Sequence, residues 1–196
     1  MAPGTTGLAT VADIGPAASV IVLGWSNFPP AEGLIGSEVL CLGMLTTAAT
    51  MWIEHALSHG HVEIIDDYAA VAVWFDRTHG PVPLPDNSDG RLAVHCGVHT
   101  ERFRRFEAFA ESHHPAFPHH HLALLAVAAG RTHLLADVLL RQHHAQLDGA
   151  QLPAVVRAYN IAQVTRYEQH GYRVLARDSM DESGPMLWIM HRSPLV

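Results

Sequence analysis

His121-Leu-Ala-Leu-Leu-Ala-Val127 is an apolar run with the length of a buried β-strand, and it decides how the second half of this chain folds. Downstream, apolar residues recur at helical spacing between Thr132 and Leu147, as expected for a helix that packs on a sheet. A second apolar run, Ala154-Val-Val-Arg-Ala158, then has the character of another strand. A strand, a helix and a strand in this order imply locally parallel strands, so these segments predict an α/β fold.

The remaining segments extend this unit on both sides. On the N-terminal side we expect a strand at 7–10, a helix that Thr10 or Asp13 caps and that ends near Gly24, a loop at 27–33 and a helix at 37–58. A hairpin of strands 61–66 and 69–75, a loop at 78–87 and a helix at 94–112 follow, and the C-terminal side adds a helix at 161–170 and strands at 172–176 and 186–191. The order β-α-α-β-β-α-β-α-β-α-β-β predicts a mixed central sheet of about six or seven strands flanked by helices.

Length and composition indicate one folded domain. The chain has 196 residues, of which 48% are hydrophobic and 16% are charged, so it is too apolar to be intrinsically disordered. The apolar run 39–53 is too short to span a bilayer and is predicted to be a buried amphipathic helix. Cys41 and Cys96 are the only cysteines, which cannot form a disulfide framework and predict a reduced, cytoplasmic setting.

Short motifs in both halves resemble one known family. Tyr167-Glu-Gln-His-Gly171-Tyr172, at its distance from the strand predicted at 119–127, is similar to the GCN5-related N-acetyltransferases (GNAT), and most of all to the puromycin N-acetyltransferase type. Asp67-Tyr-Ala-Ala-Val-Ala-Val-Trp74 resembles the strand pair of that family, and Leu8-Ala-Thr-Val-Ala-Asp13 resembles its opening. The resemblance implies a single GNAT domain over 1–196, with an acceptor side in 1–115 and a donor-binding βαβαββ part in 116–196. It also implies that an amine attacks the thioester of acetyl-CoA or another acyl-CoA.

The donor loop departs from the family pattern. The resemblance implies a glycine-rich loop between the fourth strand and the next helix, where backbone N–H groups bind pyrophosphate. In the corresponding segment, 128–137, the paired glycines are absent, bulky Leu134 and Leu135 stand near the expected phosphate, and Asp137 adds negative charge. One interpretation is that CoA binding is weakened, altered or lost; the other is that the helix N-terminus still binds phosphate, with charge from Arg131 and His133. The residues assigned to cofactor binding are Leu125, Val127, Arg131, Thr132, His133, Leu134 and Gln163.

The catalytic positions are only partly kept. Tyr167 matches the family's Tyr, whose phenol can protonate the departing thiolate. Arg157 stands where puromycin-type relatives carry a Glu, and an Arg cannot act as a base near neutral pH. Arg157 is expected either to bind a carboxylate or phosphate of the substrate or to pair with an acid such as Glu63 or Glu111. The side chains predicted to contact the acceptor are Trp25, Phe28, Trp74, His121 and Arg157.

Sixteen histidines raise the question of a metal site. The clusters 113–114 and 119–121 suggest one at first, but adjacent residues on a strand point to opposite faces, so few of these rings can converge. We therefore expect structural or substrate-contacting histidines and no metal. His133 and Asp137, one helical turn apart, are expected to pair, and His143 and His144 are expected to face solvent.

Three functions are compatible with these residues. The first is an acyltransferase that acts on a small-molecule amine in secondary metabolism or resistance. The second is a GNAT-fold protein that takes its acyl group from a carrier protein or an aminoacyl-tRNA, or that catalyses another biosynthetic reaction. The third is a protein that sequesters a ligand. The net charge of −7 counts against nucleic acid, although Arg102, Arg104 and Arg105 keep tRNA open as a donor. A homodimer is compatible with the sequence, and no membrane partner is expected.

Overall fold

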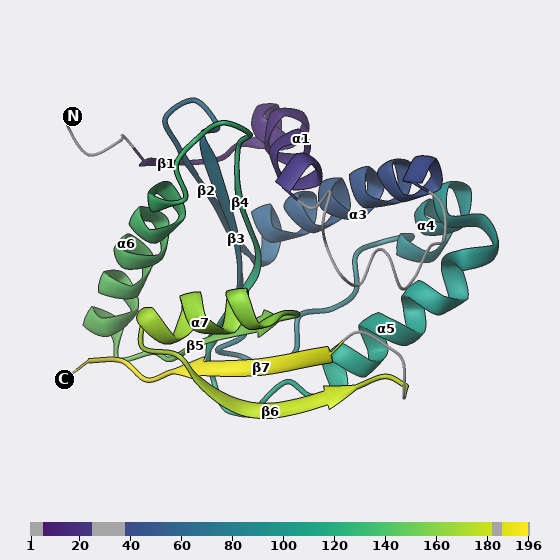
Figure 1. Cartoon of the computed structure of the whole chain (residues 1–196). Coiled ribbons are helices and arrows are strands. Elements are labelled where there is room, and N and C mark those ends of the chain that lie inside the picture. The colour runs from purple at the N-terminus through teal and green to yellow at the C-terminus, as the bar shows by residue number, and fades with distance from the viewer. Residues whose placement is uncertain (1–5, 25–37, 182–185, 196) are drawn as a thin grey trace.

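A seven-stranded mixed sheet forms the centre of the molecule (Figure 1). The computed structural model describes residues 6–24, 38–181 and 186–195. The strands are β1 (Thr6–Leu8), β2 (Gly60–Ile65), β3 (Ala70–Asp76), β4 (His120–Val127), β5 (Ala154–Ala158), β6 (Arg173–Ser179) and β7 (Met186–Arg192). The helices are α1 (Ile14–Gly24), α3 (Glu38–His59), α4 (Ser88–Cys96), α5 (Thr100–Ser112), α6 (Leu134–Ala150) and α7 (Ile161–Gln169), with 3₁₀ turns at Val11–Asp13 and Gly97–His99. The predicted α/β fold and strand number are confirmed.

The strands lie in the order β1-β2-β3-β4-β5-β7-β6, and every neighbouring pair is antiparallel except β4 and β5. The predicted hairpin is formed by β2 and β3, and its turn carries the left-handed residues Asp66, Asp67 and Tyr68. The Tyr68 hydroxyl donates to Asp13, whose carboxylate also accepts from the Thr10 N–H at 2.7 Å. The start of α1 is thereby tied to the hairpin turn.

Helices cover both faces of the sheet. Along β3, alternate side chains point to opposite faces, because successive residues of a strand do so. Val71, Val73 and Phe75 pack with α1 and α3, whereas Ala72 and Trp74 pack with α6 and α7. Figure 1 shows α6 on the opposite side of β2, β3 and β4 from α1 and α3. All residues of β3 from Ala70 to Phe75 are buried, so this strand is the middle of the core.

Among the strands that the structure describes, only β4 and β5 pair in parallel, and they do so over a short distance. Three register pairs connect them, from His120↔Ala154 to Leu122↔Val156, and beyond these the two strands separate. The rest of β4, from Ala123 onward, therefore has no β5 neighbour along that edge. This divergence opens the sheet at its centre and leaves room for a ligand beside β4.

The segment before β4 differs from the sequence-based expectation. A single helix over 94–112 was predicted, but the structure has two, α4 and α5, joined by the 3₁₀ turn at Gly97–His99. Gly97 adopts a φ of +50°, a conformation that glycine reaches without the Cβ clash that other residues incur, and it ends α4. Helix α4 also begins earlier than expected, at Ser88. The two helices are therefore free to point in different directions, and both contribute to the cavity described below.

Helix α3 is buried as the sequence predicted, with Leu45, Ala49 and Ile53 in the core. Within the described ranges, the structure has no helix with the length and apolar character needed to cross a membrane.

Candidate active site

A cavity of about 850 Å³ lies on the α3 and α5 side of the sheet. Its walls come from α3, α4, α5, the loop between β3 and α4, the diverging parts of β4 and β5, and the first two turns of α7. It extends to the place where β4 and β5 separate, because Ala123–Leu125, Arg157, Gln163 and Tyr167 all line it. The cavity is thus formed by both halves of the chain.

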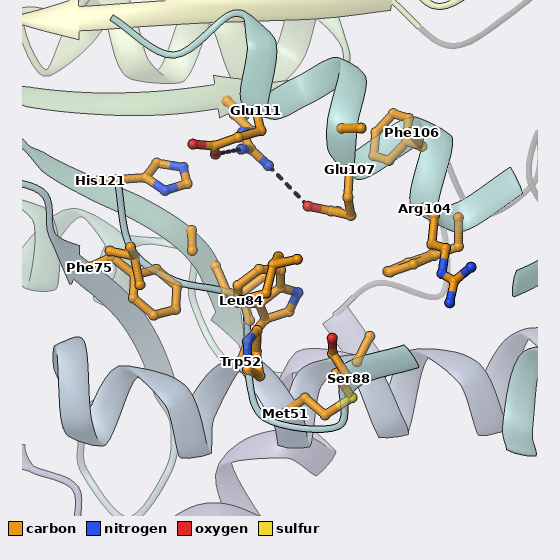
Figure 2. A pocket seen from close by; sticks show the side chains of 18 of the residues that line it. Met51, Trp52, Phe75, Leu84, Ser88, Arg104, Phe106, Glu107, Glu111 and His121 are labelled. Atoms are coloured by element: carbon orange, nitrogen blue, oxygen red, sulfur yellow. Dashed lines mark hydrogen bonds and ion pairs between the residues drawn. The ribbon is translucent and has the colours of Figure 1, made fainter. Parts of the chain in front are cut away.

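One part of the cavity is apolar. Met44 and Met51 lie two helical turns apart on α3, and Trp52 presents its ring beside them (Figure 2). Phe106 of α5 and Leu84 of the β3–α4 loop complete this wall, which Figure 2 shows on both sides of the cavity. Aromatic and thioether side chains of this kind suit an organic ligand with an apolar body.

The other part is charged. Arg77, at the end of β3, makes a bidentate contact with Glu111 of α5, with one N–O distance of 3.0 Å. Arg157 of β5 places one guanidinium nitrogen 3.4 Å from Glu107 and another 3.3 Å from Glu111. Glu107 and Glu111 are one helical turn apart, so both point from the same face of α5 (Figure 2). Two arginines and two glutamates therefore balance in charge at the cavity wall.

Glu107 has the properties of a proton acceptor. Burial raises the pKa of its carboxyl group, and the nearby Arg157 guanidinium offsets only part of that rise. Figure 2 shows the carboxylate pointing into the cavity. The Arg157 guanidinium lies 3.4 Å from it. A carboxylate with a raised pKa is a stronger base than an ordinary surface Glu. Sequence reasoning missed this residue, because a Glu on an Arg- and Glu-rich helix is typical of a solvated surface.

His121, one of the residues expected to contact the acceptor, lines the cavity. Its side chain is buried, and its Nε2 has no hydrogen-bond partner within the described residues. Burial holds the pKa of His121 well below its ordinary value, so the ring is neutral at physiological pH. Its position on β4 places it against Phe75, with the ring centroids 6.5 Å apart. The free nitrogen remains available for a polar group of a ligand.

Tyr167 and Gln163 reach the cavity from α7. Asn160 caps this helix by accepting a hydrogen bond from the Gln163 N–H at 2.8 Å, and the Gln163 Oε1 accepts from the Tyr159 N–H at 2.7 Å. These contacts fix the junction of β5 and α7 and so position Tyr167. The Tyr167 phenol is protonated at neutral pH, as an ordinary tyrosine is, and burial raises its pKa further and so makes it a weaker acid.

The other residues assigned to the cofactor lie apart from this cavity. Leu125 lines it together with Gln163, but Arg131, Thr132, His133 and Leu134 are exposed at the start of α6. Val127 packs in the core on the α6 face of the sheet. Within the described residues, the backbone N–H groups of Thr132 and His133 make no hydrogen bond, so they remain available to an anion.

Several predicted contacts are corrected by the structure. Trp74 does not line the cavity: it is fully buried on the opposite face of the sheet, because its position in β3 alternates with that of Phe75. His133 and Asp137 do not pair, since Asp137 accepts instead from His170 Nε2 at 3.0 Å. Trp25 and Phe28 lie outside the described residues.

Two further expectations concern buried histidines and Arg157. His143 and His144 do not face solvent; both are buried, because their side of α6 is the one that packs on the sheet. Arg157 does pair with Glu111, as one alternative held, whereas Glu63 lies on β2 with His143 at 3.1 Å. The structure therefore brings Tyr167, His121, Arg157, Leu125 and Gln163 into one cavity.

Comparisons with known proteins agree with this architecture. No family model matches the chain, and no curated protein matches its sequence. Among solved structures, one described as histone acetyltransferase HPA2 and related acetyltransferase, from Corynebacterium glutamicum, is 22% identical with a TM-score of 0.72, covering 99% of this chain and 98% of that one. Arylalkylamine N-acetyltransferase 2 from Aedes aegypti is 11% identical with a TM-score of 0.61, covering 97% and 98%.

The C-terminal condensation domain of Ebony, solved in complex with beta-alanyl-dopamine, is 10% identical with a TM-score of 0.61, and the match covers 98% of this chain and 100% of that domain. Other matching structures are described as members of the GNAT family or as GCN5-related N-acetyltransferases. These likenesses establish that the chain has the GNAT fold.

Proposed function

We propose that this protein is a GNAT N-acyltransferase that transfers an acyl group from an acyl-CoA to a small amine with an apolar body. The observation that carries the proposal is the cavity at the divergence of β4 and β5, where Tyr167 and Glu107 line the same space. Its apolar wall suits the body of the acceptor, and its carboxylates suit the amino group. Acceptors are also small amines for the solved arylalkylamine N-acetyltransferase.

The two halves of the chain take different parts in this proposal. Residues before 116 supply α3, α4 and α5 and with them the apolar wall and both glutamates, so this half is the acceptor side. Residues from 116 onward supply the donor side, with Leu125 and Tyr167 at the opening of the sheet. The resemblance to the puromycin type suggests a role in resistance or secondary metabolism.

The residues present at the start of α6 fit the phosphates of a CoA donor. The free N–H groups of Thr132 and His133 stand at the N-terminus of a 17-residue helix, and the side chain of Arg131 is exposed beside them. The negative charge of Asp137, which would repel a phosphate, is engaged by His170 at 3.0 Å and lies 4.0 Å from Arg166. These contacts favour retained CoA binding over its loss.

The chain's own residues can manage the protons of the reaction. When bound, the acyl-CoA supplies the thioester carbonyl that the amine attacks. Glu107 accepts a proton from the amine, and its raised pKa strengthens it for this role. Arg157 orients the Glu107 carboxylate. Tyr167 keeps its proton at neutral pH and donates it to the departing thiolate. The His121 Nε2 is available to hydrogen-bond the acceptor.

The test is binding and turnover with the purified protein. Acetyl-CoA is titrated by calorimetry, and release of free thiol is followed with a panel of arylalkylamines. We expect binding in the micromolar range and turnover of at least one amine, in line with typical enzyme affinities. Absence of heat and of thermal stabilisation at millimolar acetyl-CoA would overturn the proposal.

A second candidate is acyl transfer from a carrier protein to the same amine site. The Ebony condensation domain has this fold and was solved with an N-acylated amine, and the donor loop of the present chain lacks paired glycines. A protein that does not bind CoA but binds the N-acylated amine would favour this candidate. Calorimetry with acetyl-CoA and with an N-acyl arylalkylamine, run side by side, separates the two.

A further inference from the structure

Three side chains converge on the sheet face opposite the candidate active site. His61 and Glu63 are two residues apart on β2, so both side chains point to the same face of the sheet, toward α6. There they contact His143 of α6. His143 Nδ1 lies 3.1 Å from Glu63 Oε1 and 3.2 Å from His61 Nε2, and His61 Nε2 lies 3.6 Å from the same Glu63 oxygen. Three atoms that can each donate a lone pair therefore form a nearly equilateral triangle.

The triangle has the dimensions of one face of a tetrahedral metal site. For metal–ligand bonds of about 2.0–2.1 Å at tetrahedral angles, neighbouring ligand atoms lie about 3.3 Å apart. The three observed separations, 3.1, 3.2 and 3.6 Å, lie around that value. We propose that His61 Nε2, Glu63 Oε1 and His143 Nδ1 bind one divalent transition-metal ion, with Zn²⁺ as the best fit to two imidazoles and a carboxylate.

Hydrogen bonding alone does not satisfy this cluster. A ring nitrogen carries at most one proton, yet His143 Nδ1 faces both an imidazole nitrogen and a carboxylate oxygen at hydrogen-bond distance. The second oxygen of Glu63, Oε2, is buried and has no hydrogen-bond partner within the described residues. Buried polar atoms are nearly always partnered, so the carboxylate of Glu63 has unused capacity to bind a cation beside the two imidazoles.

The surroundings hold His143 in the orientation that such an ion requires. Its other nitrogen, Nε2, lies 3.3 Å from His120 Nδ1. When the Nδ1 of His143 binds a metal, the proton of this ring is on Nε2, and the Nε2–H can donate a hydrogen bond to His120 Nδ1. The Trp74 ring stacks on His143 with the centroids 3.8 Å apart and the planes 18° from parallel. The His143 ring is therefore fixed in both plane and tautomer.

The position of the site defines its role. Glu63 borders a second, smaller cavity of about 420 Å³ between β1 and α6, and the His61 side chain is one-quarter exposed, so an ion can enter from solvent. The sheet separates this cluster from Glu107, and although Tyr167 packs on the α6 side with Trp74, none of the three ligands lines the candidate active-site cavity. We therefore assign the ion no part in acyl transfer. It links β2, next to the edge strand β1, to α6 and so stabilises the fold. The inference does not depend on the proposed function.

The test is titration of the chelator-treated, full-length protein with Zn²⁺ and with Co²⁺. We expect one tight site per chain, the intense visible bands of tetrahedral Co²⁺, and a rise in melting temperature on adding Zn²⁺. His61→Ala removes the most exposed ligand and is expected to weaken the tight site by more than about 100-fold, beyond the cost of losing an outer-shell partner. His79→Ala, at an exposed histidine elsewhere, is the matched control and is expected to bind as the wild type does.

The comparison of variants decides the outcome, because a chain with sixteen histidines also binds metal weakly at its surface. Equal binding by the wild type and His61→Ala, or a weakly absorbing octahedral Co²⁺ spectrum, would overturn the proposal. Glu63→Gln keeps the shape of the side chain and removes its charge. If His61→Ala does not fold, metal binding by Glu63→Gln is compared with that of the wild type instead. The melting temperature of Glu63→Gln is expected not to rise with Zn²⁺, and a rise equal to that of the wild type would equally refute the site.

Discussion

Glu107→Gln is the substitution that most directly tests the assignment of the proton acceptor. The change keeps the size of the side chain and its contact with Arg157, but it removes the basic carboxylate. A positioned general base contributes about 10²–10⁴-fold to a rate, so kcat is expected to fall by at least about 100-fold. The KM for the amine is expected to change less than kcat, because the apolar wall of Met51, Trp52 and Phe106 remains and Glu111 still offers a carboxylate to the amino group.

Glu107→Gln is expected to lower the free energy of unfolding by less than the Coulomb attraction between Arg157 and Glu107 suggests. At the observed 3.4 Å and an effective dielectric constant of about 20, the attraction between Arg157 and Glu107 is roughly 5 kcal/mol before desolvation. Arg157 keeps Glu111 at 3.3 Å, and Gln still accepts a hydrogen bond. The free energy of unfolding is therefore expected to fall by only about 1–2 kcal/mol, the range of a weakened hydrogen bond.

Thiol release across pH separates a catalytic role from a structural one. The raised pKa of Glu107 predicts that kcat/KM of the wild type falls with decreasing pH at a value above the ordinary Glu pKa of 4.5, since protonation removes the base. Glu107→Gln is expected to lose this acid limb. Glu101→Gln, on the exposed side of the same helix, is the control and is expected to keep it. Wild-type kcat and an unchanged acid limb in Glu107→Gln would refute the reasoning.

Two further substitutions test other parts of the structure. Tyr167→Phe keeps the ring that packs on Tyr172 and removes the phenol, so kcat is expected to fall about 100-fold with an unchanged melting temperature, and unaltered turnover would exclude Tyr167 as the acid. Asp148→Asn breaks a bidentate pair with Arg192, whose two N–O distances are 2.7 and 2.8 Å, and is expected to lower the free energy of unfolding at pH 7 by about 1–3 kcal/mol. The Arg192 contact lowers the pKa of Asp148, so the contribution is present above the unfolded-state pKa of 3.8 and is lost as pH falls below it. Urea unfolding at pH 7 and pH 3 is expected to show a smaller difference between wild type and variant at the lower pH, while Asp181→Asn, at an exposed carboxyl, changes neither.

Most of the fold was predictable, because the strands carry strong local signals. The apolar run ending at Val127 and the hairpin with Asp67 at its turn were both placed within a few residues. The break between α4 and α5 was missed, since a single Gly97 inside a helical pattern is tolerated in many helices and ends one only when the flanking turns pack in different directions. That packing depends on residues distant in sequence.

The candidate site was less predictable, because side-chain direction is set by tertiary contacts. Trp74 and Phe75 are adjacent aromatics on a strand, and the sequence does not state which of them faces the cavity. His143 and His144 looked like a solvated pair, but the buried side of α6 includes both, and His144 Nε2 finds a partner in the Tyr172 hydroxyl at 2.9 Å. From sequence alone, a polar side chain is expected to be exposed, because the buried partner that would satisfy its hydrogen bonds is not visible in the sequence.

The position of Arg157 explains why the two glutamates lie where they do. An Arg at the opening of a sheet, near a second Arg at position 77, would leave two positive charges facing an enclosed space, and such charges are costly without partners. Glu107 and Glu111, one turn apart on α5, meet both guanidinium groups. Glu111 is shared by Arg77 and Arg157, so Glu107 has a single, longer contact and is the carboxylate left free to accept a proton. If the proposed reaction holds, the basic group therefore lies on the helix that faces Arg157, and the sharing of Glu111 between two arginines favours Glu107 as the base.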